Sequence, residues 1–497
     1  MLCLTVMLWL VLYLPRLPLE VFPRLSSPGA IISRERVVVA DEAATSAGVV
    51  PGLRLAEAWA FVPHLAVQER DPVREQLALD RLACWAGSFT SEVCCRPPAT
   101  LLLEVAGSLN LFGGAEALFR RVVFGCSGQG FTPQAALAPT PLAAQWLALA
   151  GDDRPCLDKG ELAGRLGCLP LTVLGLSVQD HLRLGRFGVR SLAGLFELPR
   201  AGLARRLGSV LAADLGRALG DLPDPRPRFA FPERFVERLE LPARVDSAPA
   251  LGFTGRRLVA SLCGWLAARG AAIRECSFVL DHPRGAGQWP VTTLKLGFSG
   301  ATRDAERIGR VFIERLQRLE LVAPVEQIGL QAGEIEALSG HTAGLFGDRG
   351  EEAGGESLAV LVERLQARLG QDRVHALSVA TEHRPENASR QVAPQIVAGR
   401  ASGLRASGMR RTPCGPRPLW LLARPQPLSE AAGRPVCGGP LQLLAGPERI
   451  ESGWWDAAEP AAIGDVRRDY FVAVSVRSEW LWIFRSRAGW FLHGVFA

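Results

Sequence analysis

Carboxylates are the side chains that could do metal-dependent chemistry in this sequence, and they are unevenly distributed. Asp and Glu supply the hard oxygen ligands that Mg²⁺ needs. The first acidic residue is Glu20, and the segment before it, Met1–Pro15, is almost wholly apolar. A short apolar run that ends at a proline is typical of a buried strand, which we place at residues 8–14. This N-terminal strand is therefore predicted to carry no metal ligand.

Other catalytic patterns are missing from the sequence. The eleven cysteines include one adjacent pair, Cys94 and Cys95, but no C-x-x-C, so a zinc site is not predicted. The seven histidines are dispersed, and neither lysine, Lys159 or Lys295, stands in a Walker A pattern. We therefore expect no metal and no cofactor. Scattered cysteines fit a reducing compartment, so we expect a cytoplasmic protein.

The composition is that of a folded protein with several domains. The chain has 497 residues, of which 48% are hydrophobic and 21% charged. A net charge of +6 is a mild basic bias that does not by itself indicate nucleic acid. The apolar N-terminus has no basic leading segment and no small-residue cleavage site, so a signal peptide is not predicted. It is also too short to span a bilayer, and no membrane partner is expected.

Strand and helix patterns alternate along the first third of the chain, which predicts an α+β fold. The expected strands are a hairpin at 30–40 and strands at 101–105 and 131–138, and the expected helices are at 74–88, 115–124 and 141–150. Further on, short helices rich in Leu, Gly and Arg are followed by a proline-rich linker and by a module that reads as an open sheet backed by two helices. An amphipathic helix is expected at 357–369. Residues 384–424 hold eight arginines against one acid and are predicted to be largely loop.

Several motifs resemble the Y-family translesion DNA polymerases, and most closely their catalytically inactive ImuB-like branch. The motifs that carry the resemblance are, in chain order, Leu8–Leu10, Ala44–Ala58, Leu103–Gly114, Leu137–Ala143, Val173–Leu195, Arg417–Leu422, Gly446–Trp455, Asp465–Phe471 and Gly489–Phe496. They cover nearly the whole chain. The resemblance implies a multidomain α+β protein with palm and fingers in residues 1–160 (fingers at about 26–73), a helix-hairpin-helix thumb at 161–221, a linker at 222–232, a little-finger α/β module at 233–335, a linker at 336–356 and a C-terminal partner-interaction region at 357–497.

The resemblance also locates the positions where polymerases hold two Mg²⁺ ions. The first pair of metal ligands corresponds to Val11 and Tyr13, and the second to Ala99 and Thr100. None of these residues is acidic, and Leu, Val or Ala cannot bind Mg²⁺. Glu104 stands where the family has a structural acid. The resemblance therefore implies a polymerase scaffold that is not an enzyme.

Two phosphate contacts of the family are altered as well. A Tyr and an Arg that hold the triphosphate correspond to Glu42 and Thr45, and a glutamate would repel phosphate. In the thumb, a G-x-G hairpin that donates backbone N–H groups to DNA reads Gly175-Leu-Ser177. That DNA contact is expected to persist in weakened form.

The family likeness assigns further DNA contact to the little-finger module. Its candidate phosphate partners are Arg256, Arg257, Arg269, Arg274 and Lys295. The alternative is that they are ordinary solvated charges, because residues 233–335 hold fourteen basic and twelve acidic residues. The Arg410-Arg411 region has a larger charge excess and could contact DNA or protein.

Partner-binding features are expected near the C-terminal end. The family's clamp-binding peptide corresponds to Thr342–Phe346, where Leu345 and Phe346 could fill a pocket of a β sliding clamp. Alternatively, the two apolar residues pack against a neighbouring domain. Trp480 and Trp482 could stack nucleic-acid bases, but strand spacing places both on one face, which favours a core role.

The leading hypothesis is a non-catalytic DNA-binding adaptor in error-prone translesion synthesis and damage-induced (SOS) mutagenesis. By resemblance it would connect DNA, the sliding clamp, a DnaE-type polymerase and a RecA-like accessory protein. One alternative is an active Y-family polymerase with displaced catalytic acids. Another is a general DNA-binding repair factor without a polymerase partner.

Overall fold

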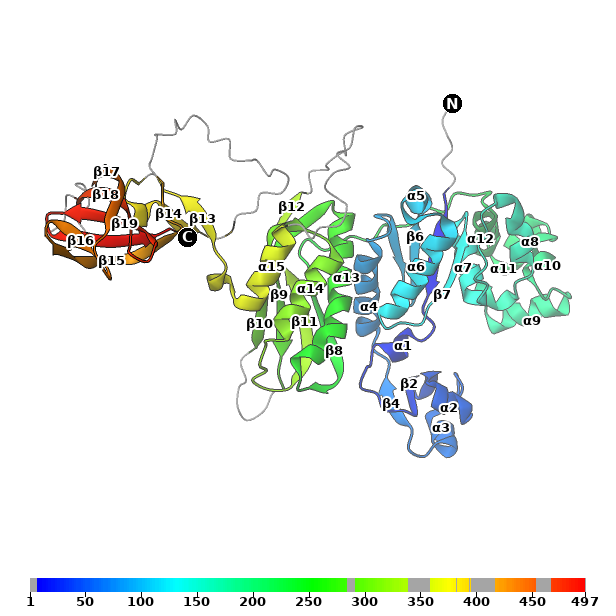
Figure 1. Ribbon diagram of the computed structural model, residues 1–497. Coiled ribbons are helices and arrows are strands. Elements are labelled where there is room, and N and C mark those ends of the chain that lie inside the picture. Colours follow the sequence, from blue (N-terminus) through cyan, green and yellow to red (C-terminus); the bar gives the residue numbers. More distant parts are fainter. Residues whose placement is uncertain are drawn as a thin grey trace, which may run out of the picture. The chain divides into compact units, whose positions relative to one another are not determined.

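The computed structural model describes residues 7–283, 291–337, 358–380, 382–392, 394, 416–452 and 466–496. The chain forms two compact units, Met1–Arg368 and Leu369–Ala497 (Figure 1). Helix α15 (Leu358–Leu369) lies almost wholly in the first unit, where Arg364 and Arg368 pair with Glu314. We expected these residues to form the start of the C-terminal region, but in the structure the helix belongs almost wholly to the first unit.

A four-stranded antiparallel sheet in the order β5-β6-β1-β7 forms the centre of the first unit. Its strands are β1 (Trp9–Tyr13), β5 (Val93–Arg96), β6 (Thr100–Glu104) and β7 (Gln134–Ala138), and its helices are α4 (Pro72–Ala86), α6 (Ala115–Gly128) and α7 (Pro141–Ala150). Leu10 and Leu12 of β1 pack with α4 and α6, whereas Trp9 and Val11 pack with α7. Because both faces of β1 are covered, every position favours an apolar side chain. This confirms the predicted buried N-terminal strand.

A small separate sheet in the order β3-β2-β4 follows β1 in the chain. It consists of β2 (Gly29–Ser33), β3 (Arg36–Ala40) and β4 (Ala66–Glu69), with the short helices α2 (Glu42–Ser46) and α3 (Leu55–Phe61) beside it. Arg34 and Glu35 both adopt positive φ angles in the tight turn between β2 and β3. The predicted hairpin at residues 30–40 is therefore confirmed.

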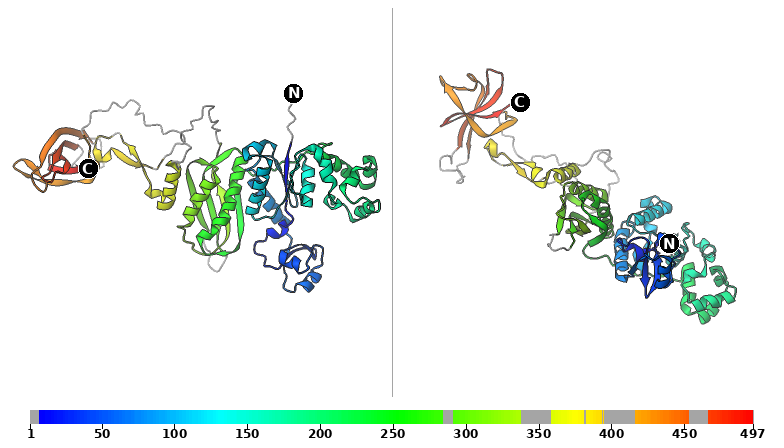
Figure 2. Two further views of the ribbon diagram at one scale, coloured as in Figure 1. Left: turned by 45° about the vertical axis from the view of Figure 1, so that its right-hand side comes forward. Right: turned by 90° about the horizontal axis from the view of Figure 1, so that it is seen from below.

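Five short helices form the predicted helical domain next to α7. They are α8 (Leu162–Gly167), α9 (Val178–Arg186), α10 (Leu192–Phe196), α11 (Arg200–Leu207) and α12 (Ser209–Leu219) (Figure 2). The buried hydroxyl of Thr140 caps α7 and donates a 2.8 Å hydrogen bond to the carbonyl of Ala218 in α12. Leucines of these helices share one apolar core with α7 and with one face of β1.

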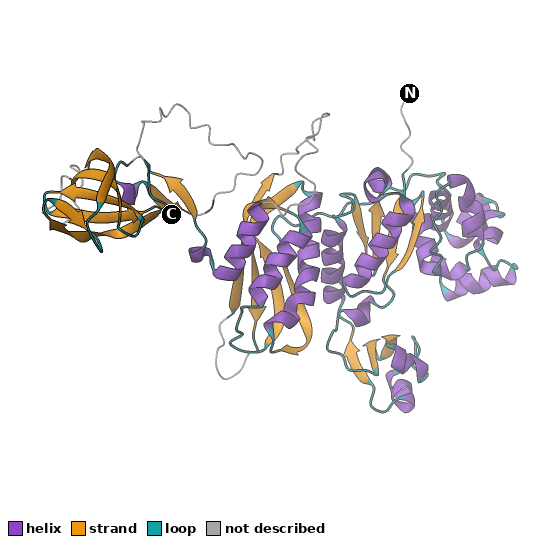
Figure 3. Cartoon of the chain, viewed as in Figure 1, coloured by secondary structure: helices purple, strands orange, loops and turns teal. Residues whose placement is uncertain are grey.

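The module after the proline-rich linker is an open antiparallel sheet in the order β10-β9-β11-β8, with β12 paired to β9 (Figure 3). Its elements are β8 (Val236–Val245), β9 (Ala271–Asp281), β10 (Thr292–Thr302), β11 (Val325–Ala332), β12 (Ile335–Ala337), α13 (Gly252–Ala268) and α14 (Ala305–Leu316). Both helices pack on one face of the sheet through a shared apolar core. The predicted open sheet backed by two helices is confirmed.

The second unit is built on a six-stranded sheet in the order β16-β15-β20-β19-β18-β17. Its strands are β15 (Trp420–Ala431), β16 (Arg434–Val436), β17 (Gln442–Ser452), β18 (Val466–Val474), β19 (Trp480–Ser486) and β20 (Gly489–Val495), and β13 (Ala376–Val379) pairs with β14 (Ser389–Val392). The expectation of loop at residues 384–424 is wrong for β14 and for the start of β15, because backbone pairing stabilises strands there despite the arginines and prolines.

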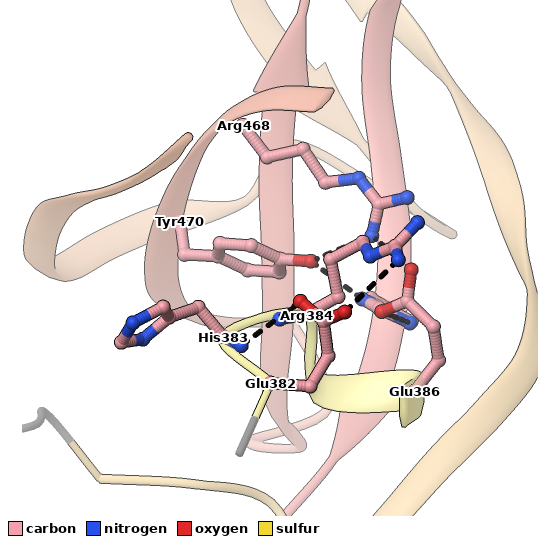
Figure 4. A network of polar contacts seen from close by, with 7 residues as sticks. Glu382, His383, Arg384, Glu386, Arg468 and Tyr470 are labelled. Carbon is pink, nitrogen blue, oxygen red and sulfur yellow. Dashed lines mark hydrogen bonds and ion pairs between the residues drawn. The ribbon is translucent and has the colours of Figure 1, made fainter. Parts of the chain in front are cut away.

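A polar network ties the segment around Glu386 to this sheet (Figure 4). Nη1 of Arg468 on β18 donates to Oε1 of Glu386 at 2.9 Å and to the hydroxyl of Tyr470 at 3.1 Å. The Tyr470 hydroxyl lies 2.8 Å from Nδ1 of His493, which is fully buried on β20. Burial lowers the pKa of His493 to about 4, although Glu386 opposes the shift. The network therefore holds a neutral histidine inside the sheet.

Candidate functional site

Two of the four predicted metal-binding positions lie in one row of paired residues across the central sheet. Tyr13 on β1 lies directly opposite Thr100 on β6, and the same row continues to Arg96 on β5 and Gln134 on β7. Directly paired residues of neighbouring strands project to the same face. The sheet thus brings together the two positions that sequence reasoning placed on adjacent strands, and its row has no carboxylate.

The other two predicted positions lie beside this row but are taken up by packing. Val11 is fully buried opposite Leu102, inside the core that the sheet shares with α7. Ala99 is buried, and its carbonyl accepts a 2.8 Å hydrogen bond from the backbone N–H of Leu14. Both positions therefore have apolar side chains that are buried.

A guanidinium is the charged member of the row. Nη1 of Arg96 donates a 2.5 Å hydrogen bond to Oε1 of Gln145 on α7. Burial lowers the pKa of Arg96, and the nearby Arg226 lowers it further, while Asp214 and Asp224 oppose the change. Sequence reasoning missed Arg96, because only the strand register places it beside Thr100. The positive charge of this exposed side chain opposes the binding of a divalent metal ion nearby.

The acids closest to this region in sequence hold structural positions. Glu20 accepts from the backbone N–H of Thr132, and Glu92 pairs with Arg228 at 2.6 Å. Oε1 of Glu104 accepts from the backbone N–H groups of Leu8 and Ala106 at 3.1 and 3.2 Å. Throughout the described ranges, no three His, Cys, Asp or Glu residues are grouped so that they could hold a metal ion.

The predicted triphosphate positions share one side of α2. Glu42 and Thr45 are three residues apart and both exposed, and this spacing places them together on a helix surface. The N-cap of the helix is already occupied, since Asp41 accepts from the backbone N–H of Ala44. The pair therefore presents a carboxylate and a hydroxyl to solvent.

The predicted phosphate-binding hairpin directly precedes α9. Gly175 adopts a positive φ of 61°, and Ser177 caps α9 by accepting from the backbone N–H of Asp180. Both Gly175 and Ser177 are exposed. However, the Ser177 hydroxyl also donates to Oδ2 of Asp180 at 2.6 Å, so a carboxylate stands beside the hairpin.

The five cations predicted for the little-finger-like module do not form one surface. Arg257 reaches toward residues outside the module: its guanidinium donates to the carbonyl of Gln129, while Nε2 of Gln129 donates back to the carbonyl of Arg257 at 3.3 Å. Arg269 donates to the carbonyls of Phe231 and Pro232 and lies over the ring of Trp265. Both arginines thus make hydrogen bonds within the chain, and their contact with phosphate stays a prediction.

The remaining three cations are exposed but face different directions. Arg274 pairs with Glu336 at 2.5 Å. Lys295 lies between Leu294 and Leu296 of β10, and both leucines pack in the core beneath the helices. Because side chains alternate along a strand, Lys295 lies on the helix-free face of the sheet. Arg256 lies on α13, on the helical side. Arg256 therefore lies on the other side of the sheet from Lys295.

The predicted partner-binding features are only partly visible. Leu345, Phe346, Trp454, Trp455 and the Arg410-Arg411 pair all lie outside the described residues. Trp482 is a core residue at 1% exposure, as expected, whereas Trp480 is 53% exposed and the expectation of a core role is wrong for it. Among the described residues, no helix combines the length and apolar character needed to cross a membrane.

Comparison with known proteins gives one strong match by sequence. No family model matches the chain. Protein ImuB of Caulobacter vibrioides, in each of two strains, is 28% identical over 469 residues, which cover 90% of this chain and 100% of that protein. The match extends through both compact units.

Comparison of structures finds polymerases with low overall superposition. A ternary complex of Dbh shares 14% identity at a TM-score of 0.39 and covers 66% of this chain and 98% of its own. DinB from Sulfolobus solfataricus shares 14% identity at a TM-score of 0.38, with 66% and 99% covered. The sequence match to ImuB is therefore the comparison on which the following argument rests.

Proposed function

We propose that this chain, an ImuB-like protein related to the Y-family DNA polymerases, is a non-catalytic DNA-binding adaptor in error-prone translesion synthesis. Its similarity to ImuB supports a polymerase-like protein connected with DNA damage. The observation that carries the non-catalytic role is the pairing of Tyr13 with Thr100, in a row whose charged member is Arg96.

The chemistry of that row supports an adaptor rather than an enzyme. Polymerases use carboxylates on adjacent strands to hold two Mg²⁺ ions, which activate the 3′-hydroxyl and neutralise the triphosphate. Tyr and Thr hydroxyls carry no negative charge at neutral pH, and Arg96 adds a positive one. Glu42 at the triphosphate position would repel the nucleotide. The residues at these positions therefore favour neither metal binding nor triphosphate binding.

The adaptor acts by joining partners that the chain holds at different places. DNA contacts the exposed hairpin at Gly175 and Ser177 and the sheet face that carries Lys295, with Arg256 and Arg274 as peripheral contacts. Leu345 and Phe346 bind the β sliding clamp, and the C-terminal unit binds a DnaE-type polymerase and a RecA-like accessory protein. The protein works in the cytoplasm, without a cofactor and without a membrane.

Primer extension tests the absence of catalysis. The purified full chain, supplied with Mg²⁺, dNTPs and a primer-template, is expected to extend no primer. Template-dependent extension that disappears in Glu104→Gln would overturn the proposal in favour of an active polymerase with displaced acids. Gln keeps an oxygen acceptor for the backbone N–H groups of Leu8 and Ala106, so this variant should retain the fold. Exposed Glu116→Gln is the matched control.

A clamp pull-down separates the adaptor from a general DNA-binding repair factor. Wild type should retain the sliding clamp, and the double variant Leu345→Ala/Phe346→Ala should lose it. The matched control is Leu377→Ala/Val379→Ala, which removes two side chains that are 78% and 81% exposed in the second unit. If neither the clamp nor a polymerase is recovered with wild type, the general repair factor is the better description.

DNA binding is tested through its salt dependence. Lys295→Ala should weaken binding of a primer-template and reduce the slope of log K against log salt by about 1, because one phosphate contact is lost. Lys295→Arg preserves the charge and should preserve the slope. Equal slopes for wild type and Lys295→Ala would remove this sheet face from the DNA-binding surface.

A further inference from the structure

An apolar hollow of about 700 Å³ lies in the helical domain, between α9 and α11. Its lining includes Leu184, Phe187, Leu198, Leu203, Arg206 and Leu207. Leu184 and Leu203 are buried at its base, whereas Phe187 is 65% exposed. A hollow of this size accepts bulky apolar side chains, and most of its lining comes from α9 and α11.

The rim of the hollow is strongly basic. Residues 178–207 contain six arginines against two acids, Asp180 and Glu197. Arg206 lies over the ring of Phe187 with its guanidinium carbon 5.4 Å from the ring centroid. Of the two arginines that line the hollow, Arg183 pairs with Asp180, whereas no carboxylate in the described part of the chain lies within ion-pair distance of Arg206. The rim therefore has positive charge that internal partners do not neutralise.

The hollow and the hairpin at Gly175 and Ser177 stand at opposite ends of one helix. Ser177 precedes α9, whereas Phe187 follows it, and the helix between them has nine residues. At 1.5 Å per residue the two ends are about 13 Å apart. The hollow is therefore lined from the C-terminal half of α9, whereas the hairpin precedes its first residue.

We infer that this hollow docks an acidic amphipathic helix of a partner protein. Bulky apolar side chains at i, i+3 or i+4 spacing would enter the hollow beside Phe187, and carboxylates on the flanks of that helix would meet Arg206 and Arg183, the two arginines that line it. Nucleic acid fits the arginines but not the floor, because leucines offer no hydrogen-bond partner to phosphate or sugar. The inference is independent of whether the central sheet is catalytic.

Gly202 provides a variant that fills the hollow without disturbing the fold. It lines the hollow within α11, and a Cβ at this position would meet no heavy atom within 4 Å. Leucine also favours the helical conformation more than glycine does. Gly164→Leu is the matched control, because Gly164 lies in α8 of the same domain, away from the hollow and with equally open space around its Cβ.

The test measures binding of a fluorescent designed peptide to the full-length protein. The peptide is a helix of about 18 residues with leucines on one face and glutamates on the others. We expect it to bind wild type and Gly164→Leu equally, and to bind Gly202→Leu at least about tenfold more weakly. A peptide with lysines in place of the glutamates should bind wild type at least about tenfold more weakly than the acidic one.

Three results would overturn the inference. The first is the absence of acidic-peptide binding to wild type. The second is equal binding to wild type and Gly202→Leu, which would show attraction to the arginines alone. The third is displacement of the peptide by a single-stranded oligonucleotide whose own affinity falls equally in Gly202→Leu, which would make the hollow a nucleic-acid site.

Discussion

Gly264 of α13 lies against the backbone of Cys84 on α4. A Cβ at position 264 would come within 2.3 Å of the carbonyl oxygen of Cys84, and a Cβ at Gly87 would come within 2.5 Å of the carbonyl oxygen of Gly264. Real side chains do not tolerate such distances from backbone atoms. The two glycines therefore allow the module of residues 233–335 to pack directly on the central domain.

Replacing Gly264 by alanine should destabilise the first unit. The added methyl group must push α4 and α13 apart, which costs on the order of 1–3 kcal/mol. Urea unfolding followed by circular dichroism measures the change. Gly309→Ala is the matched control, because Gly309 lies in α14 and its Cβ would meet nothing within 4 Å. It should be neutral or stabilising by about 0.5–1 kcal/mol. Equal effects of the two substitutions would mean that the helices do not depend on this close contact.

Glu237 should make the same unit more stable in mild acid. Burial raises the pKa of this carboxyl to about 7, against the opposing effects of Ser261, whose hydroxyl donates to it at 2.6 Å, and of Arg81. Between pH 4.5 and pH 7 the folded chain retains a proton that the unfolded chain has lost. The contribution of Glu237 to stability is thus complete below pH 4.5 and is lost as the pH rises through 7.

The variant Glu237→Gln isolates that contribution. Gln resembles the protonated carboxyl at every pH, so the free energy of unfolding of wild type relative to Glu237→Gln should fall between pH 5 and pH 8. Parallel pH profiles would contradict the raised pKa.

The second unit should respond to pH in the opposite direction. The pKa of His493 lies near 4 in the folded chain, mainly because of burial, against an ordinary value of 6.5. Between these values the unfolded chain binds a proton that the folded chain excludes, so stability is complete above pH 6.5 and falls as the pH decreases toward 4. The slope should approach about 1.4 kcal/mol per pH unit. Fluorescence of Trp482, which stacks against His493, reports unfolding of this unit. His493→Asn should flatten the profile, and an unchanged slope would assign it to another group.

Local patterns in the sequence predicted much of this architecture. The apolar run of β1 indicated a buried strand, and the helix expected at residues 141–150 is α7, as the structure confirms. The family resemblance predicted phosphate contacts at Arg257 and Arg269, and the structure adds that these residues donate to backbone carbonyls elsewhere in the chain. Local sequence does not reveal such long-range contacts.

At the candidate site, too, residue types are visible in the sequence, whereas contacts between strands are not. That Tyr13 and Thr100 carry no carboxylate is visible in the sequence itself. The cation beside them could not be predicted, because Arg96 reaches the row only through the register of β5 against β6. Likewise, β15 begins in a stretch rich in arginine and proline, and pairing with β20 rather than its own composition makes it a strand.

The ion pair between Arg468 and Glu386 should stabilise the second unit more than a comparable surface pair does. The Arg468 side chain is 16% exposed and that of Glu386 27%, and Arg468 also lies over the ring of Phe484. Arg468→Ala leaves Glu386 without this partner and removes the contact with Phe484, so we expect the free energy of unfolding to fall by about 2–4 kcal/mol.

Arg449→Ala is the matched control on β17, because Arg449 forms a two-pronged pair with Asp469 while its side chain is 65% exposed. Its effect should be much smaller and should disappear in concentrated salt, because solvent and ions screen exposed charges. Thermal unfolding of the two variants at low and high salt measures both effects. If Arg468→Ala is as mild and as salt-sensitive as Arg449→Ala, the network of Figure 4 does not hold the segment around Glu386 on the sheet.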